Sequence, residues 1–193
     1  GSLGGKARGL AFMNSMLIKY RLYDKYPDVR VLIPRTIVIA TDYFDAFIRG
    51  NGLKYVISKE LSDDEILSEF IGSTLPTELT EQLRVYIRTV HSPLAVRSSS
   101  KLEDSHYQPF AGIYSTYMIP YVENEDQMLR LLFKAIKSVY ASVYFAESRA
   151  YIQSSQNLIS EEKMAVVVQE VCGTEQDGLF FPTLSGVARS INY

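Results

Sequence analysis

Hydrophobic residues recur along the chain at helical spacings in several separate segments. Residues 7–22 place Leu10, Met13, Leu17 and Ile18 three or four positions apart, which predicts an amphipathic helix. Further helices with an apolar stripe are predicted at residues 42–50, in two stretches between about 60 and 91, and at 124–150.

Short apolar runs between these helices predict buried strands. The segment 29–41 is expected to form two strands separated by Pro34, which cannot occupy a central ladder position. The apolar run at 93–96 and the largely apolar run at 163–171 predict further strands, and the run at 178–184 is expected to pair with the second of these across a turn. Helices mixed with hairpin-like strand pairs favour an α+β fold with a mixed or antiparallel sheet.

The length of 193 residues fits one domain. Residues 1–52 and 92–193 are expected to form the main α/β body, with a small helical insert at 53–91. The chain opens with "GSLGGKARGL" and ends with "SGVARSINY". Both ends resemble interrupted motifs, so we expect a fragment of a longer protein.

Composition excludes several classes of protein. A net charge of -2 and a pI near 5.8 argue against a general nucleic-acid or anionic-membrane surface, so any anion site is local. Cys172 is the single cysteine, and His91 and His106 lack metal-ligand spacing, so neither a disulfide nor a zinc site is expected. No signal peptide or membrane-length apolar run is present in the sequence, which favours the cytoplasm.

Gly4, Gly5 and Lys6 precede the first predicted helix. Glycines at a helix start offer unhindered amides, and a lysine adds a mobile charge, a combination that suits a phosphate. The P-loop pattern is not matched, because Ala7 follows the lysine where Ser or Thr is required. The alternative is a flexible helix start with a solvated lysine.

Arg97 follows an apolar run that should lie in the interior. A guanidinium there requires an anionic partner, and its planar fork binds phosphate or carboxylate through two parallel hydrogen bonds. Either a bound anion or an ion pair with Glu103 or Asp104 satisfies this requirement. The three serines at 98–100 supply small hydrogen-bond donors beside it.

The polar segment after these serines is open to several interpretations. Glu103 and Asp104 can hold magnesium or form a solvated edge. Gly112 lets backbone approach a ligand closely or marks an ordinary turn. His106 is expected to be exposed rather than catalytic, and Gln169 with Glu170 either presents backbone groups to a purine or ends a buried strand.

The block "LAVRSSSKLEDSHYQPFAGIYSTYM" at 94–118 combines Ala-Val-Arg-Ser-Ser, Glu-Asp and Phe-Ala-Gly. Together with "GGKARGLAFM", "IPRTIVIATDYFDAFI", and "MAVVVQEV" followed by "GLFF", it resembles the N-terminal nucleotide-binding domain of the phosphoenolpyruvate synthase and pyruvate phosphate dikinase family. This block resembles the motif of the synthases in that family more than that of the dikinases. The resemblance spans nearly the whole chain except about 53–91.

This resemblance implies an ATP-grasp-like first lobe and an ATP site. Lys6 and Arg97 would hold the phosphates as the catalytic residues, with Gly4 and Gly5 at the helix start. The remaining nucleotide-binding residues implied by the family fall into three groups. They are Ser98, Ser99, Glu103 and Asp104, which shape a loop; Phe110, Ala111 and Gly112, which close over the phosphates; and Gln169 and Val171, which line the adenine region.

Family members transfer the β-phosphoryl group of ATP to a histidine on a separate swivelling domain, and then to pyruvate. The resemblance therefore implies ATP and Mg²⁺ as cofactors, and a phosphohistidine domain and a pyruvate-binding domain of the same parent chain as partners. Magnesium ligands are expected beyond residue 193. The isolated chain is accordingly expected to be inactive and to bind ATP weakly or not at all.

One departure from the family pattern keeps other functions open. After "GLFF" the family usually shows a polar residue and then Asp-Pro, whereas this chain reads "FPTLSGVARS". One alternative is a phosphotransferase with another acceptor, such as an antibiotic or a glucan. The other is a degenerate lobe that serves a regulatory role without catalysis.

Overall fold

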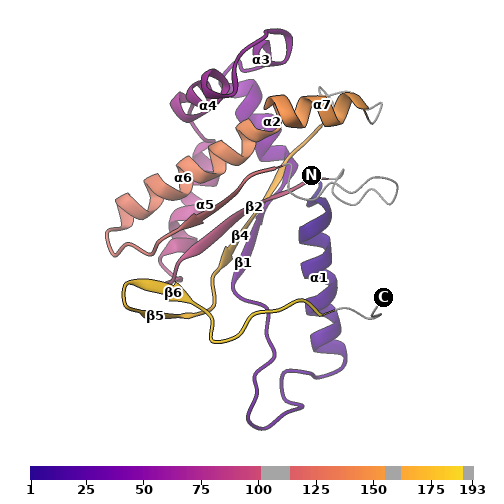
Figure 1. Cartoon of the computed structure of the whole chain (residues 1–193), viewed down its shortest axis with the longest axis vertical. Coiled ribbons are helices and arrows are strands. Elements are labelled where there is room, and N and C mark those ends of the chain that lie inside the picture. Colours follow the sequence, from indigo (N-terminus) through magenta and orange to yellow (C-terminus); the bar gives the residue numbers. More distant parts are fainter. Residues whose placement is uncertain (101–113, 155–161, 189–193) are drawn as a thin grey trace.

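A four-stranded antiparallel sheet organises the chain in the computed structural model, which describes residues 1–100, 114–154 and 162–188 (Figure 1). Its strand order is β1-β4-β2-β3. The α+β class and the antiparallel sheet predicted from the sequence are confirmed. The elements are α1 (Gly4–Lys19), β1 (Thr36–Ile39), α2 (Thr41–Gly50), α3 (Tyr55–Ser58), α4 (Asp63–Gly72), α5 (Thr77–Ile87), β2 (Leu94–Ser99), β3 (Thr116–Ile119), α6 (Glu125–Ser142), α7 (Ala146–Ser154), β4 (Ala165–Glu170), β5 (Thr174–Gln176) and β6 (Leu179–Phe181).

Strand β2 lies inside the sheet and pairs on both sides. Arg97 stands opposite Val167 of β4 and opposite Thr116 of β3. Ala95 stands opposite Gln169 of β4. Ala95 and Arg97 are two residues apart on β2 and so face the same side of the sheet. Because directly opposed residues share a face, Gln169 lies on that side as well. The register therefore places two of the predicted site residues on one face.

The other face of the sheet carries the hydrophobic core. Leu94, Val96 and Val168 alternate with the residues of the site face and pack into this core with α6. Rings from α2 and α6 meet there: Phe47 lies 5.5 Å from Tyr140, centroid to centroid. Tyr140 of the long helix α6 thus packs in the core.

Helices α3, α4 and α5 occupy the segment predicted to be helical between residues 53 and 91 (Figure 1). Helix α4 begins with a complete capping box, in which Ser62 accepts from the Glu65 amide and Glu65 accepts from the Ser62 amide. Helix α5 is joined to α6 by an ion-pair cluster. Arg84 and Arg88 both bind Glu125, at 2.6 Å and 2.8 Å.

Helix α1 packs on the site face through its first turn. Gly4 has a φ of +69°, and a Cβ atom built on it would lie 1.8 Å from the carbonyl oxygen of Ser99. A side chain there would collide with the backbone of β2, so glycine is required for this approach. The buried residues of α1 are Gly4, Gly5 and Ala7, all in this turn.

The rest of α1 differs from the sequence prediction. The helix spans Gly4–Lys19 instead of 7–22, and its apolar stripe does not enter the core: Met13 is 51% exposed and Ile18 is 60% exposed. The periodicity was that of an amphipathic helix, but the contact that anchors it uses glycines, which a hydrophobic pattern does not record.

Three other predictions of the strands and helices are wrong in part. Of the two strands predicted in the segment 29–41, only β1 forms. Before β1 there is an isolated bridge between Tyr26 and Val29. Strand β6 pairs with β5 in a separate two-stranded sheet, because β4 is already paired with β1 and β2. The helix predicted at 124–150 is divided into α6 and α7, which resumes at Ala146.

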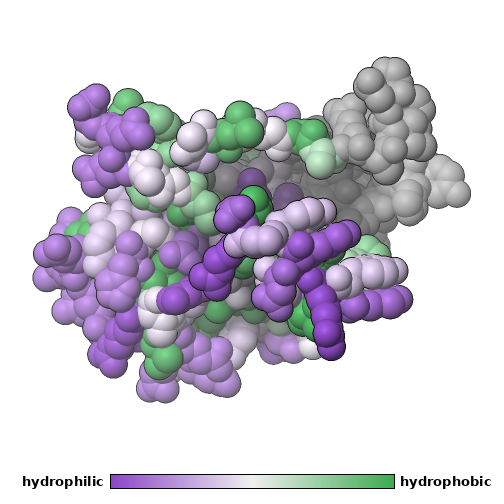
Figure 2. All heavy atoms as spheres, turned by 90° about the horizontal axis from the view of Figure 1, so that it is seen from below, coloured by the Kyte–Doolittle hydropathy of each residue, from purple (hydrophilic) through white to green (hydrophobic). Residues whose placement is uncertain are grey.

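The surface mixes hydrophobic and hydrophilic side chains. Figure 2 shows this for the face seen from below, where residues of the two kinds are interspersed. Leu184 and Val187 of the C-terminal segment are 89% and 84% exposed. Within the described ranges, every helix falls short of the length or apolar character that crossing a membrane demands.

We predict that Glu125→Gln makes the free energy of unfolding of the domain less dependent on pH in the acid range. Hydrogen bonds from Arg88 and Arg84 lower the pKa of Glu125 from its ordinary 4.5 to about 2. The ionised carboxylate therefore contributes stability above pH 4.5, and this contribution is lost as the pH falls toward 2. Between pH 6 and pH 3, the free energy of unfolding measured with urea should fall less for the variant than for the wild type.

Glu81→Gln is the matched control, because Glu81 is an exposed glutamate of α5. The free energy of unfolding of this variant should fall with pH as it does for the wild type. If Glu125→Gln also declined with the wild-type slope, the ion-pair cluster would have no measurable part in joining α5 to α6.

We also predict opposite effects for alanine at two glycines of α1. Gly4→Ala should destabilise the domain by more than about 1–2 kcal/mol, the cost of a left-handed backbone for an L-residue, because the steric collision adds to it. Gly9→Ala should stabilise it by about 0.5–1 kcal/mol, because Gly9 lies within the helix and a Cβ there meets no atom within 4 Å. Denaturant unfolding measures both; equal effects would refute the close packing at Gly4.

Candidate functional site

Lys6 lies in the first turn of α1, at the end of β2. Its side chain is exposed at the surface, and Nζ donates to the Ser98 hydroxyl at 3.4 Å. These two residues are 92 positions apart in the sequence. The fold therefore brings the predicted lysine beside the predicted serines, next to Arg97 in the chain.

The amides of the first turn are engaged within the protein. Gly5 donates to the carbonyl of Ser100 at 3.1 Å, and Ala7 donates to the hydroxyl of Ser99 at 3.2 Å. The expectation of an unhindered amide is therefore wrong at Gly5, because the strand end supplies the acceptor. The glycines let the helix approach β2, and the side chain of Lys6 extends from this fixed turn.

Arg97 is exposed, and the expectation that it lies in the interior is wrong. Leu94, Ala95 and Val96 before it are buried, but α1 covers the site face only in part. Within the described ranges, no ion pair or side-chain hydrogen bond involves Arg97. Its guanidinium therefore lies open to solvent on the face of the sheet that also carries α1.

Gln169 lies further along the same face. Its side chain donates to the hydroxyl of Thr36 at 2.9 Å, which ties β4 to β1. Opposite it stands Ala95, four residues before Ser99 on β2. At ~3.3 Å per residue, this separates Gln169 from the end of the strand by roughly 13 Å.

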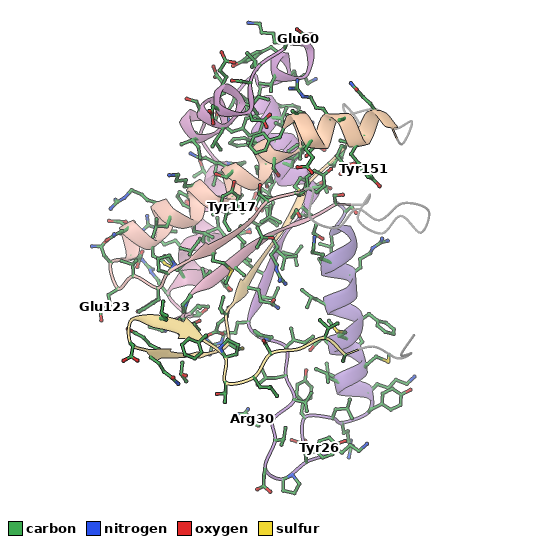
Figure 3. All side chains as sticks on the ribbon, in the orientation of Figure 1. Tyr26, Arg30, Glu60, Tyr117, Glu123 and Tyr151 are labelled. Carbon is green, nitrogen blue, oxygen red and sulfur yellow. The ribbon has the colours of Figure 1, made fainter. Side chains whose placement is uncertain are left out.

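Val171 lies just beyond β4 and lines a cavity of about 650 Å³. This open cavity is lined by the segment before β1, the turn before β2, and the connection from β4 to the β5–β6 hairpin. Its lining combines an aromatic ring, Phe180, with the guanidinium groups of Arg30 and Arg35 and the carboxylate of Glu170. Figure 3 shows Arg30 on the connection that precedes β1.

Two of the side chains that line this cavity form hydrogen bonds. The Ser92 hydroxyl donates to Glu170 at 2.9 Å, and Arg35 donates to the carbonyl of Thr89. Sequence reasoning missed Arg30, Arg35 and Phe180. Phe180 stood within the "GLFF" run that the sequence did single out, whereas the two arginines flank an apolar segment without any periodic signal.

A second cavity, of about 360 Å³, separates α1 from β1 and has mainly apolar walls, including Ala7, Leu10 and Val38. In the part of the chain that the structure describes, neither this cavity nor the one at Val171 is lined by Lys6 or Arg97. Val171 donates to the carbonyl of Pro93 just before β2 begins, whereas Lys6 contacts Ser98 near the end of β2.

The remaining predicted residues lie outside the described part of the chain. Glu103, Asp104, Phe110, Ala111 and Gly112 all belong to residues 101–113, as does His106. Cys172 is an exposed free thiol. Over the described ranges, no group of three or more His, Cys, Asp or Glu side chains is arranged to hold a metal ion.

The curated proteins that are similar to this chain include two phosphoenolpyruvate synthases and a phosphotransferase. An uncharacterized phosphotransferase, YvkC, from Bacillus subtilis is 30% identical over 77% of the chain, which matches 17% of that protein. The phosphoenolpyruvate synthase of Aeropyrum pernix is 25% identical over 93% of the chain and 22% of the relative. A probable phosphoenolpyruvate synthase from Staphylothermus marinus is 27% identical over 77% of the chain and 20% of the relative.

The chain thus spans about a fifth of the length of these relatives. The family comparison covers more of it: the pyruvate phosphate dikinase AMP/ATP-binding domain matches residues 1–193. The match includes both α1 and the strands that carry Arg97 and Gln169. The chain belongs to the family of the pyruvate phosphate dikinase AMP/ATP-binding domain.

Proposed function

We propose that this chain is the ATP-binding lobe of a phosphoenolpyruvate synthase-like dikinase, with an ATP-grasp-like arrangement. The observation that carries the proposal is the convergence of Lys6 with the end of β2, where Nζ donates to the hydroxyl of Ser98, the residue that follows Arg97 in the chain. An ammonium and a guanidinium are the groups that hold transferring phosphates. The membership of an AMP/ATP-binding family supports the same ligand.

The nucleotide would extend along the site face of the sheet. Its phosphates would lie against Lys6 and Arg97, with Ser98 and Ser99 at the strand end beneath them. Its adenine would lie toward Gln169 and the cavity at Val171, where Phe180 offers a ring for stacking. The separation of roughly 13 Å along β2 suits an extended nucleotide. Residues 103–112 would complete the phosphate end.

In the longer protein, the β-phosphoryl group of ATP would pass to a histidine on a swivelling domain, leaving AMP and phosphate, and then to pyruvate. The names of two relatives, phosphoenolpyruvate synthase and probable phosphoenolpyruvate synthase, support this acceptor. The histidine domain and the pyruvate-binding domain are partners that this proposal places outside residues 1–193.

Magnesium would neutralise charge on the phosphates during this transfer. The described residues do not form a ligand group for it, and we assign no step to the metal here. This chain's own contribution is to bind and orient: the two cations would fix the phosphates, Arg97 from strand β2 and Lys6 from the first turn of α1, which is bonded to the end of β2.

We predict that Lys6→Ala and Arg97→Ala each weaken ATP binding to the longer protein by about tenfold to a hundredfold. Losing a charged hydrogen-bonding partner of a phosphate costs about 1.5–3 kcal/mol. Isothermal titration calorimetry with ATP would measure the change. Circular dichroism and thermal unfolding would verify that both variants remain folded.

Lys134→Ala and Arg130→Ala serve as matched controls, because they remove the same charges from exposed positions of α6. Both should bind ATP within twofold of the wild type. A loss below twofold in Lys6→Ala and Arg97→Ala would contradict the proposed phosphate site.

We further predict that residues 1–193 alone release no phosphate from ATP above the uncatalysed rate. Positioning of an acceptor histidine is needed for transfer, and this acceptor would lie in another domain. A phosphate-release assay at millimolar ATP tests this directly. Turnover by the isolated chain that disappeared in Arg97→Ala would show that the catalytic apparatus is complete within it.

A further inference from the structure

We infer that Ser99 is a positioning residue that holds Lys6 in place for the phosphates without touching the nucleotide itself. This inference rests on the proposed function. Ser99 is fully buried at the end of β2, whereas Lys6 is exposed beside it. The argument depends on how the serine hydroxyl enters the first turn of α1.

The Ser99 hydroxyl bridges two backbone groups of this turn. It donates to the carbonyl of Leu3 at 2.8 Å and accepts from the amide of Ala7 at 3.2 Å. Leu3 and Ala7 are four residues apart, the spacing of acceptor and donor in the first hydrogen bond of an α-helix. Ser99 therefore joins the two ends of one helical turn from outside the helix.

Ser99 bonds to a helix start that has no side-chain cap. Leu3 occupies the N-cap position, and its apolar side chain makes no capping hydrogen bond. A capping serine accepts from the second or third amide of a helix, whereas Ser99 accepts from the fourth, that of Ala7. Because the hydroxyl comes from a strand 96 residues away in the sequence, closing the first helical turn and fixing its position on the sheet are one interaction.

Lys6 lies between the two amides that are tied to the strand. Gly5 before it donates to Ser100, and Ala7 after it donates to Ser99. The close approach of Gly4 to the Ser99 backbone holds the same turn from the other end. The Cα of Lys6 is thus fixed relative to β2, and so is the reach of its amine toward Ser98 and a phosphate.

The test is a double-mutant cycle in the longer protein, with ATP affinity measured by calorimetry for wild type, Lys6→Ala, Ser99→Ala and the double variant. If Ser99 acts through Lys6, Ser99→Ala should weaken ATP binding about tenfold when Lys6 is present and less than twofold when it is alanine. An equal loss in both backgrounds would overturn the inference.

Ser142→Ala controls for general destabilisation. Ser142 is also fully buried, and its hydroxyl donates to the carbonyl of Val139 at 2.7 Å within α6. It should lower the Tm while ATP affinity stays within twofold of the wild type. A loss of affinity comparable to that of Ser99→Ala would attribute both to instability and overturn the inference.

The design separates this inference from the proposed function. A loss below twofold in Lys6→Ala would overturn the phosphate role of Lys6 and the inference with it. A tenfold loss in Lys6→Ala without coupling to Ser99 would overturn the inference alone. Should Ser99→Ala fail to fold, Ser99→Cys carries the same cycle, because it keeps a weak donor and acceptor at that position.

Discussion

The contact between the first turn of α1 and the end of β2 is the constraint on which the candidate site depends. It joins residues more than ninety positions apart, through the Ser99 hydroxyl, the Gly5 amide and the side-chain-free surface of Gly4. A Cβ at Gly4 would meet the Ser99 carbonyl at 1.8 Å, so the helix has almost no freedom to approach differently. Because these bonds are directional and buried, they fix orientation as well as proximity.

The sheet gives this contact a rigid base. Strand β2 is paired on both sides, with β4 and β3, and its core-facing residues Leu94 and Val96 are fully buried against α6. The strand end that receives α1 is therefore held by hydrogen bonds and by packing on the opposite face. Residues 101–113, which include the predicted nucleotide-closing segment, follow directly in the sequence. Binding groups on regular elements are held more accurately than groups on loops.

Hydrophobic periodicity was enough to predict the helices α2, α4, α5 and α6 and the buried run of β4, because each buries a continuous apolar face. It was not enough for the site. The acceptor of the Gly5 amide is Ser100, a tertiary contact without any local signal. The sequence pattern likewise placed Arg97 in the interior, since three buried residues precede it, but alternation along β2 directs its side chain to the partly covered face. Family resemblance supplied the residues, and the register showed which of them share a face.

Arg97 differs from Arg84 and Arg88 in one respect that bears on function. Arg84 and Arg88 are held by carboxylates on α6, and their charges serve to join two helices. Arg97 has no such partner among the described residues, and its exposure means that solvent stabilises its charge at little cost. The fold therefore does not require a cation at this position, and replacing it should change stability by less than about 0.5 kcal/mol. Because folding does not need this cation, which stands on the same face of the sheet as Gln169, an effect of its removal on ATP affinity reports on binding instead of on folding.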